Sequence, residues 1–335
     1  MWSLQLSVVV PTRNRPESIR RLLRSLSAQS LPSDQFEVIV VDDGSEPPLR
    51  LVAEDGPWSF SCRVIHRDAD HGAHASRWAG LRAASGERIL FLDDDVIAEP
   101  QVLRAHASPA LGERIALGPI LYPDQSDSTP YFRYMASFYL ACYLRVIRNQ
   151  GLAPAEYYVC NSSGPRATFL TAFDVVSERY PHRIVGAEFD ESLLARVHAM
   201  RSTERVFLSD AMLWHADTSS LAEALSGALQ SGQATGRLVV EGSFPNAAWP
   251  LAGPILGPSI PARLRRFAMY CFWALPRPCL LAAQVLATVA ERGPRRFVPR
   301  WICHAPLRLA RWEGMRSVCP SFNELIQLLV AARVE

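Results

Sequence analysis

The chain contains no lysine, so its 35 positively charged side chains are all arginines. This absence excludes a Schiff-base lysine and the phosphate-binding lysine of a P-loop. The seven cysteines are odd in number and none stands in a C-x-x-C spacing, which disfavours a disulfide framework and a zinc ribbon and favours a reducing compartment. No G-x-G-x-x-G follows the first strand-like run, which disfavours a nicotinamide-dependent enzyme.

Excess charge is also lacking, since the 335 residues carry a net charge of +2. A balance near zero argues against a dedicated nucleic-acid binder. With 49% hydrophobic residues the chain has ample material for one large or two ordinary domains. Residues 1–5 lack the basic head and long apolar stretch of a signal peptide, so a cytoplasmic protein is expected.

Short apolar runs alternate with helical patterns over the first 125 residues. The predicted strands cover residues 4–10, 36–41, 63–66 and 88–92. One helix is predicted to begin at Pro16, and a second spans 73–84 with Gly86 as its C-terminal cap. Strands separated by helices imply right-handed crossovers and an α/β fold with a mainly parallel sheet.

Acidic residues follow two of these strands, at the edge of the sheet where ligands bind. Asp93, Asp94 and Asp95 repel one another, and the simplest compensation is a divalent cation, Mg²⁺ or Mn²⁺, that neutralises a bound diphosphate. The alternative is a helix cap with a solvated turn. Asp42 and Asp43 follow the second strand; they either hold a nucleobase N–H or ribose hydroxyls, or close a turn.

Four segments in this order resemble the family 2 glycosyltransferases of GT-A fold. They are residues 7–15 (SVVVPTRNR), 41–45 (VDDGS), 72–81 (GAHASRWAGL) and 86–95 (GERILFLDDD). The resemblance is strong over residues 1–125 and weaker to about residue 220. It implies a nucleotide-sugar-binding α/β/α sandwich, a nucleotide-diphospho-sugar donor, expected to be UDP-linked, and an inverting transfer to a glycan, lipid or polysaccharide precursor.

The resemblance also assigns roles to individual residues. The implied donor-binding residues are Pro11, Thr12, Arg13, Asp42, Asp43, Arg77, Asp93 and Asp94. Asp93 and Asp95 match the outer positions of the family's D-x-D motif, and with the late His215 they are the expected ligands of Mg²⁺ or Mn²⁺. Trp78 stands where the family usually has asparagine.

An inverting transfer needs a base that takes the proton of the acceptor hydroxyl. The family supplies it from an acidic pair before a helix, and the corresponding segment here is 186–196 (GAEFDESLLAR). Spacing back from Arg196 selects Asp190, which we favour, and reading forward from Gly186 selects Glu188. Capping of a helix is the alternative role for both. Residues 160–165 (CNSSGP) are expected to form a loop near the acceptor.

The predicted organisation is a glycosyltransferase domain followed by a helical C-terminal region. The glycosyltransferase domain spans residues 1–218, with a donor half at 1–125 and an acceptor half at 126–218. The C-terminal region spans residues 219–335. From residue 261 onward there are twelve arginines and four glutamates, and the apolar stretch 268–290 is interrupted by Arg277 between two prolines. We expect either two short helices on an anionic membrane surface, or an ordinary helical subdomain with its arginines in solvent.

Two other functions compete with the glycosyltransferase hypothesis. A non-catalytic nucleotide-sugar-binding or scaffold protein accords with Trp78 and with the irregular acidic segment around Asp190. A nucleotidyltransferase also needs carboxylates and a metal, but residues 11–15 lack the glycines of its phosphate loop.

Overall fold

The computed structural model describes most of the N-terminal two thirds of the chain and a few C-terminal positions. The described residues are 4–51, 58–123, 130–148, 159–179, 204–216, 224–230 and 232–233, with Val285, Leu307, Ala310, Glu313, Gly314 and Ser317. The chain divides into two compact units. The first comprises Met1–Pro123, Tyr139–Arg183 and Glu191–Asp217, and the second comprises Asp124–Phe138, Ile184–Asp190 and Thr218–Glu335.

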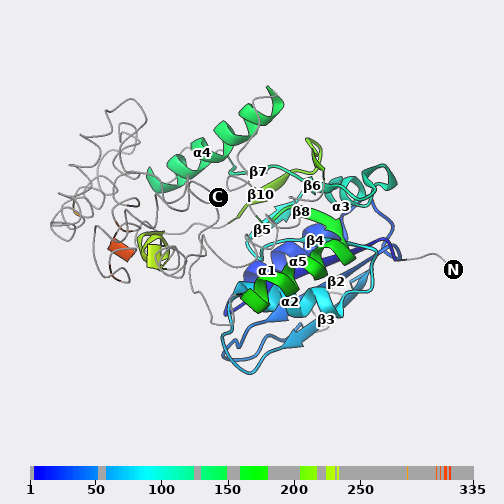
Figure 1. Cartoon of the computed structure of the whole chain (residues 1–335), viewed down its shortest axis with the longest axis horizontal. Helices are drawn as coiled ribbons and strands as arrows, with labels where there is room; N and C mark the ends of the chain where they lie inside the picture. The colour runs from blue at the N-terminus through cyan, green and yellow to red at the C-terminus, as the bar shows by residue number, and fades with distance from the viewer. Residues whose placement is uncertain are drawn as a thin grey trace. The chain divides into compact units, whose positions relative to one another are not determined.

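The first unit is built on a seven-stranded sheet of order β3-β2-β1-β4-β8-β6-β9 (Figure 1). Its strands are β1 (Leu6–Thr12), β2 (Phe36–Asp42), β3 (Ser61–His66), β4 (Arg88–Phe91), β6 (Ile115–Leu117), β8 (Ser162–Pro165) and β9 (Arg205–Phe207). Strands β1 to β4 are mutually parallel, β6 and β9 are parallel, and β8 is antiparallel to both neighbours. The predicted α/β fold with a mainly parallel sheet is therefore confirmed.

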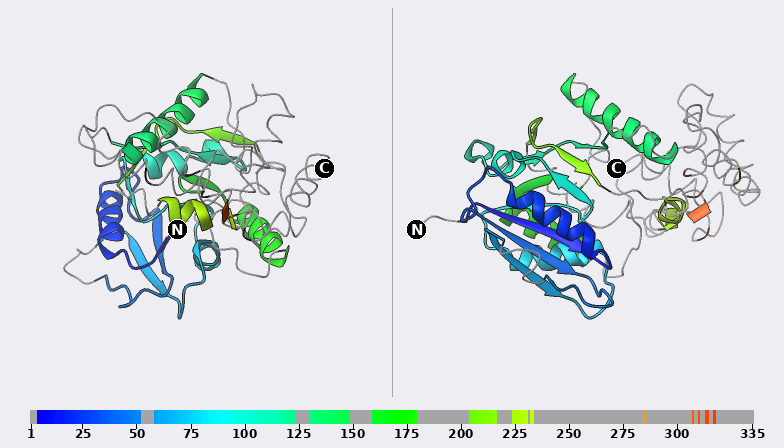
Figure 2. Two further views of the ribbon diagram at one scale, coloured as in Figure 1. Left: turned by 90° about the vertical axis from the view of Figure 1, so that its left-hand side faces the viewer. Right: turned by 180° about the vertical axis from the view of Figure 1, so that it is seen from behind.

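Helices lie on both faces of this sheet (Figure 2). Helix α1 (Pro16–Ser27) lies on one face, and α2 (Ala73–Ala83) and α5 (Arg166–Arg179) lie on the other. The remaining helices are α3 (Val102–His106) and α4 (Pro130–Ile147), whose residues are divided between the two units. The crossover through α1 leads from β1 outward to β2, whereas the crossover through α2 leads from β3 back to β4. Two right-handed crossovers in opposite directions place their helices on opposite faces. A smaller sheet, of order β5-β10-β7, is formed by β5 (Val96–Ala98), β7 (Ile120–Leu121) and β10 (Leu213–His215).

The core follows from the sequence pattern. Strands β1 and β2 are buried at every position, as strands covered on both faces must be. Helix α1 starts with Pro16 at its first position and buries one stripe, namely Ile19, Leu22, Leu23 and Leu26. The loop predicted at residues 160–165 is wrong over most of its length, because β8 is paired on both sides in the sheet.

Gly86 does not cap α2, contrary to the prediction, because the capping residue is Ala84 in an extended conformation. Gly86 instead lets the chain approach β1. A Cβ on Gly86 would lie 2.7 Å from the nitrogen of Ser7 and 2.8 Å from the carbonyl carbon of Leu6. Because these are backbone atoms, they have little freedom to move aside.

We therefore expect Gly86→Ala to lower the free energy of unfolding by about 1–3 kcal/mol, the range for overpacked sites. Urea denaturation measures this change in the free energy of unfolding. Ser85→Ala, at the exposed neighbouring position, is the control and should leave the midpoint unchanged. Equal midpoints for the two variants would contradict the steric argument.

His106 is completely buried, at 0% exposure. Its Nδ1 lies 2.7 Å from Ser163 Oγ and its Nε2 lies 2.9 Å from Asn161 Oδ1. Burial lowers the pKa of His106 from 6.5 to about 4, although the hydrogen bond to Asn161 opposes this shift. The ring is therefore neutral in the folded protein at neutral pH.

This depressed pKa predicts an acid-dependent loss of stability. Between about pH 6.5 and pH 4 the unfolded chain binds a proton that the folded protein does not, so stability falls as the pH falls through that window, by about 3 kcal/mol. His106→Gln should flatten that slope, because glutamine binds no proton in this pH window. Equal slopes for wild type and His106→Gln in urea melts across the window would refute the assignment.

None of the described helices is long and apolar enough to cross a membrane. The apolar stretch at 268–290 lies outside the described residues except for Val285, so both interpretations of that stretch stay predictions.

Candidate functional site

The carboxyl ends of β1, β2 and β4 lie at one edge of the sheet and bring both acidic clusters there. Thr12 is in register with Asp42, and the backbone N–H of Asp43 donates to the Thr12 carbonyl at 2.9 Å. On the other side of β1, Val9 is in register with Phe91, the last residue of β4. The shared edge follows directly from the parallel pairing predicted from the sequence.

The Asp93–Asp95 cluster is partly neutralised by arginines from two other segments. Arg77 of α2 donates from Nη2 to Asp93 Oδ1 at 2.7 Å. Arg15, between β1 and α1, places its Nη1 2.9 Å from Asp95 Oδ2 and 3.4 Å from Asp94 Oδ1. These pairs were not predicted from the sequence, where a divalent cation was the expected compensation. The available signal was Arg15, a fixed cation in the loop that follows the neighbouring parallel strand.

Asp94 faces inward and joins two loops. Its Oδ2 accepts a 2.6 Å hydrogen bond from Thr12 Oγ1, and its side chain is buried. Burial, together with the charges of Asp95 and Asp93, raises the pKa of Asp94 to about 7, against the opposing effects of Thr12 and Arg15. In this arrangement Asp94 and Thr12 brace the end of β1 against the end of β4. Donor binding by these two residues stays a prediction.

The structure places Asp95 and His215, two of the predicted metal ligands, near each other. His215 Nε2 lies 3.8 Å from Asp95 Oδ1, and the backbone N–H of Ala216 donates to the Asp95 carbonyl at 2.7 Å. The His215 ring stacks on Tyr122, with ring centroids 4.7 Å apart and an angle of 5° between planes. Tyr122 was not predicted from the sequence, because nothing in the residues around it distinguishes it from other tyrosines.

Asp95 and His215 fit a metal site that substrate phosphates and water complete, better than one built from protein side chains alone. Among the described residues, no group of three or more His, Cys, Asp and Glu side chains could hold a metal ion. Mg²⁺ is commonly held by one or two protein carboxylates together with substrate phosphates and water. Asp95 and His215 supply one carboxylate and one imidazole, a donor set that also suits Mn²⁺. In this structure Asp93 pairs with Arg77 and Asp95 pairs with Arg15, so the roles of Asp93, Asp95 and His215 as metal ligands stay predictions.

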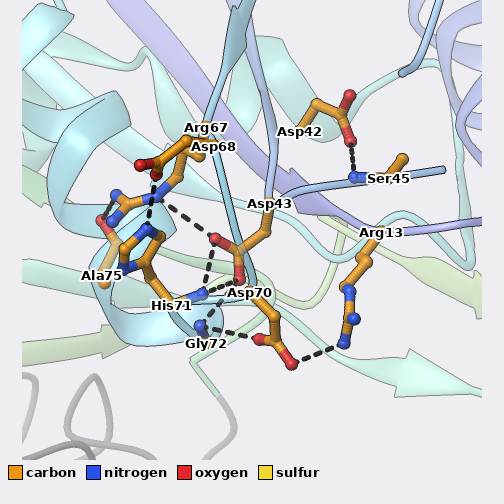
Figure 3. A network of polar contacts seen from close by, with 10 residues as sticks. All are labelled: Arg13, Asp42, Asp43, Ser45, Arg67, Asp68, Asp70, His71, Gly72 and Ala75. Carbon is orange, nitrogen blue, oxygen red and sulfur yellow. Dashed lines mark hydrogen bonds and ion pairs between the residues drawn. The ribbon is translucent and has the colours of Figure 1, made fainter. Parts of the chain in front are cut away.

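The second acidic cluster organises the loop before α2 (Figure 3). Asp43 accepts hydrogen bonds from the backbone N–H groups of His71 and Gly72, at 3.1 and 2.7 Å, and pairs with Arg67 Nε at 3.2 Å. Arg13 reaches the same loop, because its Nη1 lies 2.5 Å from Asp70 Oδ2. Arg13 and Asp43 therefore converge on one loop, as a common pocket requires.

Asp42 points away from this loop and closes a turn. Its carboxylate accepts from the backbone N–H groups of Ser45 and Leu49, at 3.2 and 2.8 Å, and lies 3.0 Å from His66 Nδ1. Burial by itself raises the pKa of Asp42, but the hydrogen bonds from Ser45, Leu49 and His66 outweigh it and lower the pKa below its ordinary value. The turn-closing alternative accounts for this geometry.

The remaining predicted residues are distributed as follows. Pro11 is buried within β1, in register with Val41. Trp78 lies under the guanidinium of Arg82, which is 5.3 Å from the ring centroid. Asp190 and Glu188 lie outside the described residues.

Comparison with known proteins covers mainly the N-terminal half. An uncharacterized glycosyltransferase of Haemophilus influenzae is 43% identical over 96 residues, which are 29% of this chain and 31% of that protein. The validoxylamine A glucosyltransferase of Streptomyces hygroscopicus subsp. limoneus is 39% identical over 110 residues, 31% of this chain and 24% of that protein. The undecaprenyl-phosphate 4-deoxy-4-formamido-L-arabinose transferase of Pseudomonas fluorescens is 29% identical over 181 residues, 52% and 50% of the two chains. The chain thus spans at most half the length of these relatives.

Solved structures are similar at lower identity. Staphylococcus aureus TarS 1–349 is 16% identical with a TM-score of 0.47, covering 95% of this chain and 91% of that one. The mannosyltransferase PcManGT of Pyrobaculum calidifontis, in complex with GDP-Man and Mn²⁺, is 19% identical with a TM-score of 0.47, covering 98% and 87%. Residues 7–166 match the family model described as glycosyl transferase family 2. Over these residues, just under half of the chain, the protein is similar to glycosyl transferase family 2.

Proposed function

We propose that this protein is a metal-dependent, inverting glycosyltransferase with a nucleotide-diphospho-sugar donor, UDP-linked. The observation that carries the proposal is the approach of Asp95 and His215 to 3.8 Å at a sheet edge that also presents Arg77 and Arg15. A metal ligand pair and guanidinium groups at one edge are suited to a diphosphate, which carries negative charge at several oxygens. The match of residues 7–166 to the glycosyl transferase family 2 model supports transfer of a sugar.

Asp95 and His215 would hold Mg²⁺ or Mn²⁺, and such an ion neutralises the charge that develops on a departing nucleoside diphosphate. Arg77 presents a rigid fork of N–H donors at the same edge, oriented by Asp93. On the base side, Arg13 and Asp43 border the loop that ends at Gly72, and we assign them to the nucleoside.

Asp190 is proposed as the base that takes the proton of the acceptor hydroxyl, with Glu188 as the second candidate. The acceptor class is a glycan, a lipid or a polysaccharide precursor. Relatives named for a small-molecule and for an undecaprenyl-phosphate reaction accord with a family that varies its acceptors.

The function is tested by thermal-shift screening of nucleotide sugars with Mn²⁺, because a ligand that binds the folded state raises its apparent stability. Hits are then incubated with acceptors. Release of a nucleoside diphosphate with sugar transfer is expected. Binding without turnover across the panel would favour the scaffold alternative, and release of pyrophosphate would favour the nucleotidyltransferase.

We also propose that the arginine-rich part of residues 261–300 associates peripherally with anionic membrane surfaces of the cell interior. Basic residues near an anionic surface each contribute about 1 kcal/mol to such binding. Co-sedimentation should occur with vesicles containing anionic lipid and disappear with neutral vesicles. Equal sedimentation with both would remove the electrostatic basis.

A further inference from the structure

Asn161 occupies a buried junction between the segments that carry the candidate site. Its exposure is 1%, and its φ of 60° lies in the left-handed region, which asparagine tolerates better than most residues. Its backbone N–H donates to the carbonyl of Phe91 at 2.8 Å, two residues before Asp93. Its backbone carbonyl accepts from the N–H of Gly118 at 2.9 Å.

The side-chain amide of Asn161 reaches two further segments. Its Nδ2 donates to the carbonyl of Pro119 at 2.8 Å and to the carbonyl of Ala211 at 2.7 Å. Pro119 directly precedes β7, which leads to Tyr122, and Ala211 is two residues before β10, which carries His215. One side chain therefore joins the stacked pair of Tyr122 and His215 to the strand that ends at Asp93–Asp95.

A chain of hydrogen bonds fixes the orientation of this amide. Since both N–H groups of Asn161 face carbonyls, its Oδ1 must accept, and His106 Nε2 lies 2.9 Å away as the donor. The other nitrogen of the neutral ring then accepts from the hydroxyl of Ser163, at 2.7 Å. Ser163 Oγ in turn accepts from Arg88 Nε at 3.0 Å. Every proton along this chain has an assigned place, so a flipped amide would place oxygen against oxygen.

The junction is also closely packed. A Cβ on Gly118 would lie 2.4 Å from Asn161 Nδ2 and 2.4 Å from the carbonyl oxygen of Ala211. A single methyl group at Gly118 would therefore force the amide and the start of β10 apart, although it removes no hydrogen bond.

We propose that Asn161 is a positioning residue that holds His215, stacked on Tyr122, at its distance from Asp95. This inference rests on the proposed function for its catalytic meaning, but its geometry does not. Asn161 acts through the backbone of the three segments and touches no reacting group.

The test observes the ring proton resonances of His215 in protein labelled at histidine, at one fixed alkaline pH. A ring stacked on Tyr122 resonates upfield, and His215→Ala assigns the signal. Asn161→Asp keeps the backbone preference and the acceptor but loses both amide donors, and Gly118→Ala crowds the junction. Both variants should lose the upfield shift of His215, whereas His66, beside Asp42, keeps its resonance as an internal control.

A second readout is the affinity for Mn²⁺ alone, which should weaken roughly 10-fold or more in both variants, as for other outer-shell partners of metal ligands. If a variant does not fold, His106→Gln, which removes the ring that orients the amide and leaves Asn161 and Gly118 in place, should still broaden or shift the His215 signal. A folded variant with the wild-type His215 resonance overturns the proposal. Because the resonance needs neither donor nor turnover, a failure of the proposed function leaves this test intact. The experiment thus separates the positioning proposal from the proposed function. If the variants lose the upfield shift of His215 while the wild-type protein transfers no sugar, the positioning role of Asn161 is supported and the glycosyltransferase function is refuted.

Discussion

Asp95→Asn is expected to slow glycosyl transfer about 1,000-fold, because a metal supplies several kcal/mol of charge stabilisation and each 1.36 kcal/mol is tenfold in rate. Asp95 is the carboxylate that approaches His215, and its own side chain is only 14% exposed. Removal of its charge weakens the metal ion's attachment while the side-chain shape is kept. Initial rates at saturating donor, with Mn²⁺ varied, measure the effect.

The matched control is Asp210→Asn, at an exposed position in the turn between β9 and β10. It makes the same chemical change near His215 in the sequence and should retain wild-type activity. Higher Mn²⁺ should restore part of the Asp95→Asn rate, because the loss acts through affinity. If neither Asp95→Asn nor chelation by EDTA changes turnover, the metal role is wrong.

Asp190→Asn is expected to lower kcat by roughly 10²–10⁴-fold, the usual contribution of a positioned general base. The donor KM should change little, because the base contacts the acceptor hydroxyl and not the diphosphate. Glu188→Gln, two residues away, is the matched variant and should keep most of the activity. The pH dependence of kcat should lose its acidic limb in Asp190→Asn alone.

The opposite pattern, with Glu188→Gln inactive and Asp190→Asn active, would transfer the role to Glu188. If both variants retain wild-type kcat, the acidic segment does not supply the base. Urea denaturation of both variants serves as a check on folding, because it does not depend on activity.

The parallel core could be predicted from sequence because its signals are local. Strands β1 and β2 are continuous apolar runs, and the stripe of α1 repeats at helical spacing. The edge on which Asp43 and Asp95 meet follows from parallel pairing alone. The approach of His215 to Asp95 was accessible only through the family resemblance, because 120 residues separate them in the chain.

Other features depend on tertiary contacts that no local pattern encodes. Strand β8 reads as SSGP, which has the composition of a turn, yet it is held between β4 and β6 by backbone pairing and by Arg88. The arginine partners of Asp93–Asp95 come from a loop and a helix distant in the chain. Gly86 resembled a helix cap, because a requirement for close approach to β1 leaves no mark in its neighbours.

The two outermost strands of the seven-stranded sheet bear on pairing between strands of different molecules. Open strand edges invite pairing with another molecule. Strand β9 is only three residues long, and β3 carries the half-exposed Arg63, which pairs with Glu37 of β2. The short length of β9 and the positive charge of Arg63 on β3 both disfavour pairing with another molecule. Within the described sheet, neither edge strand therefore offers a long apolar strand for intermolecular addition.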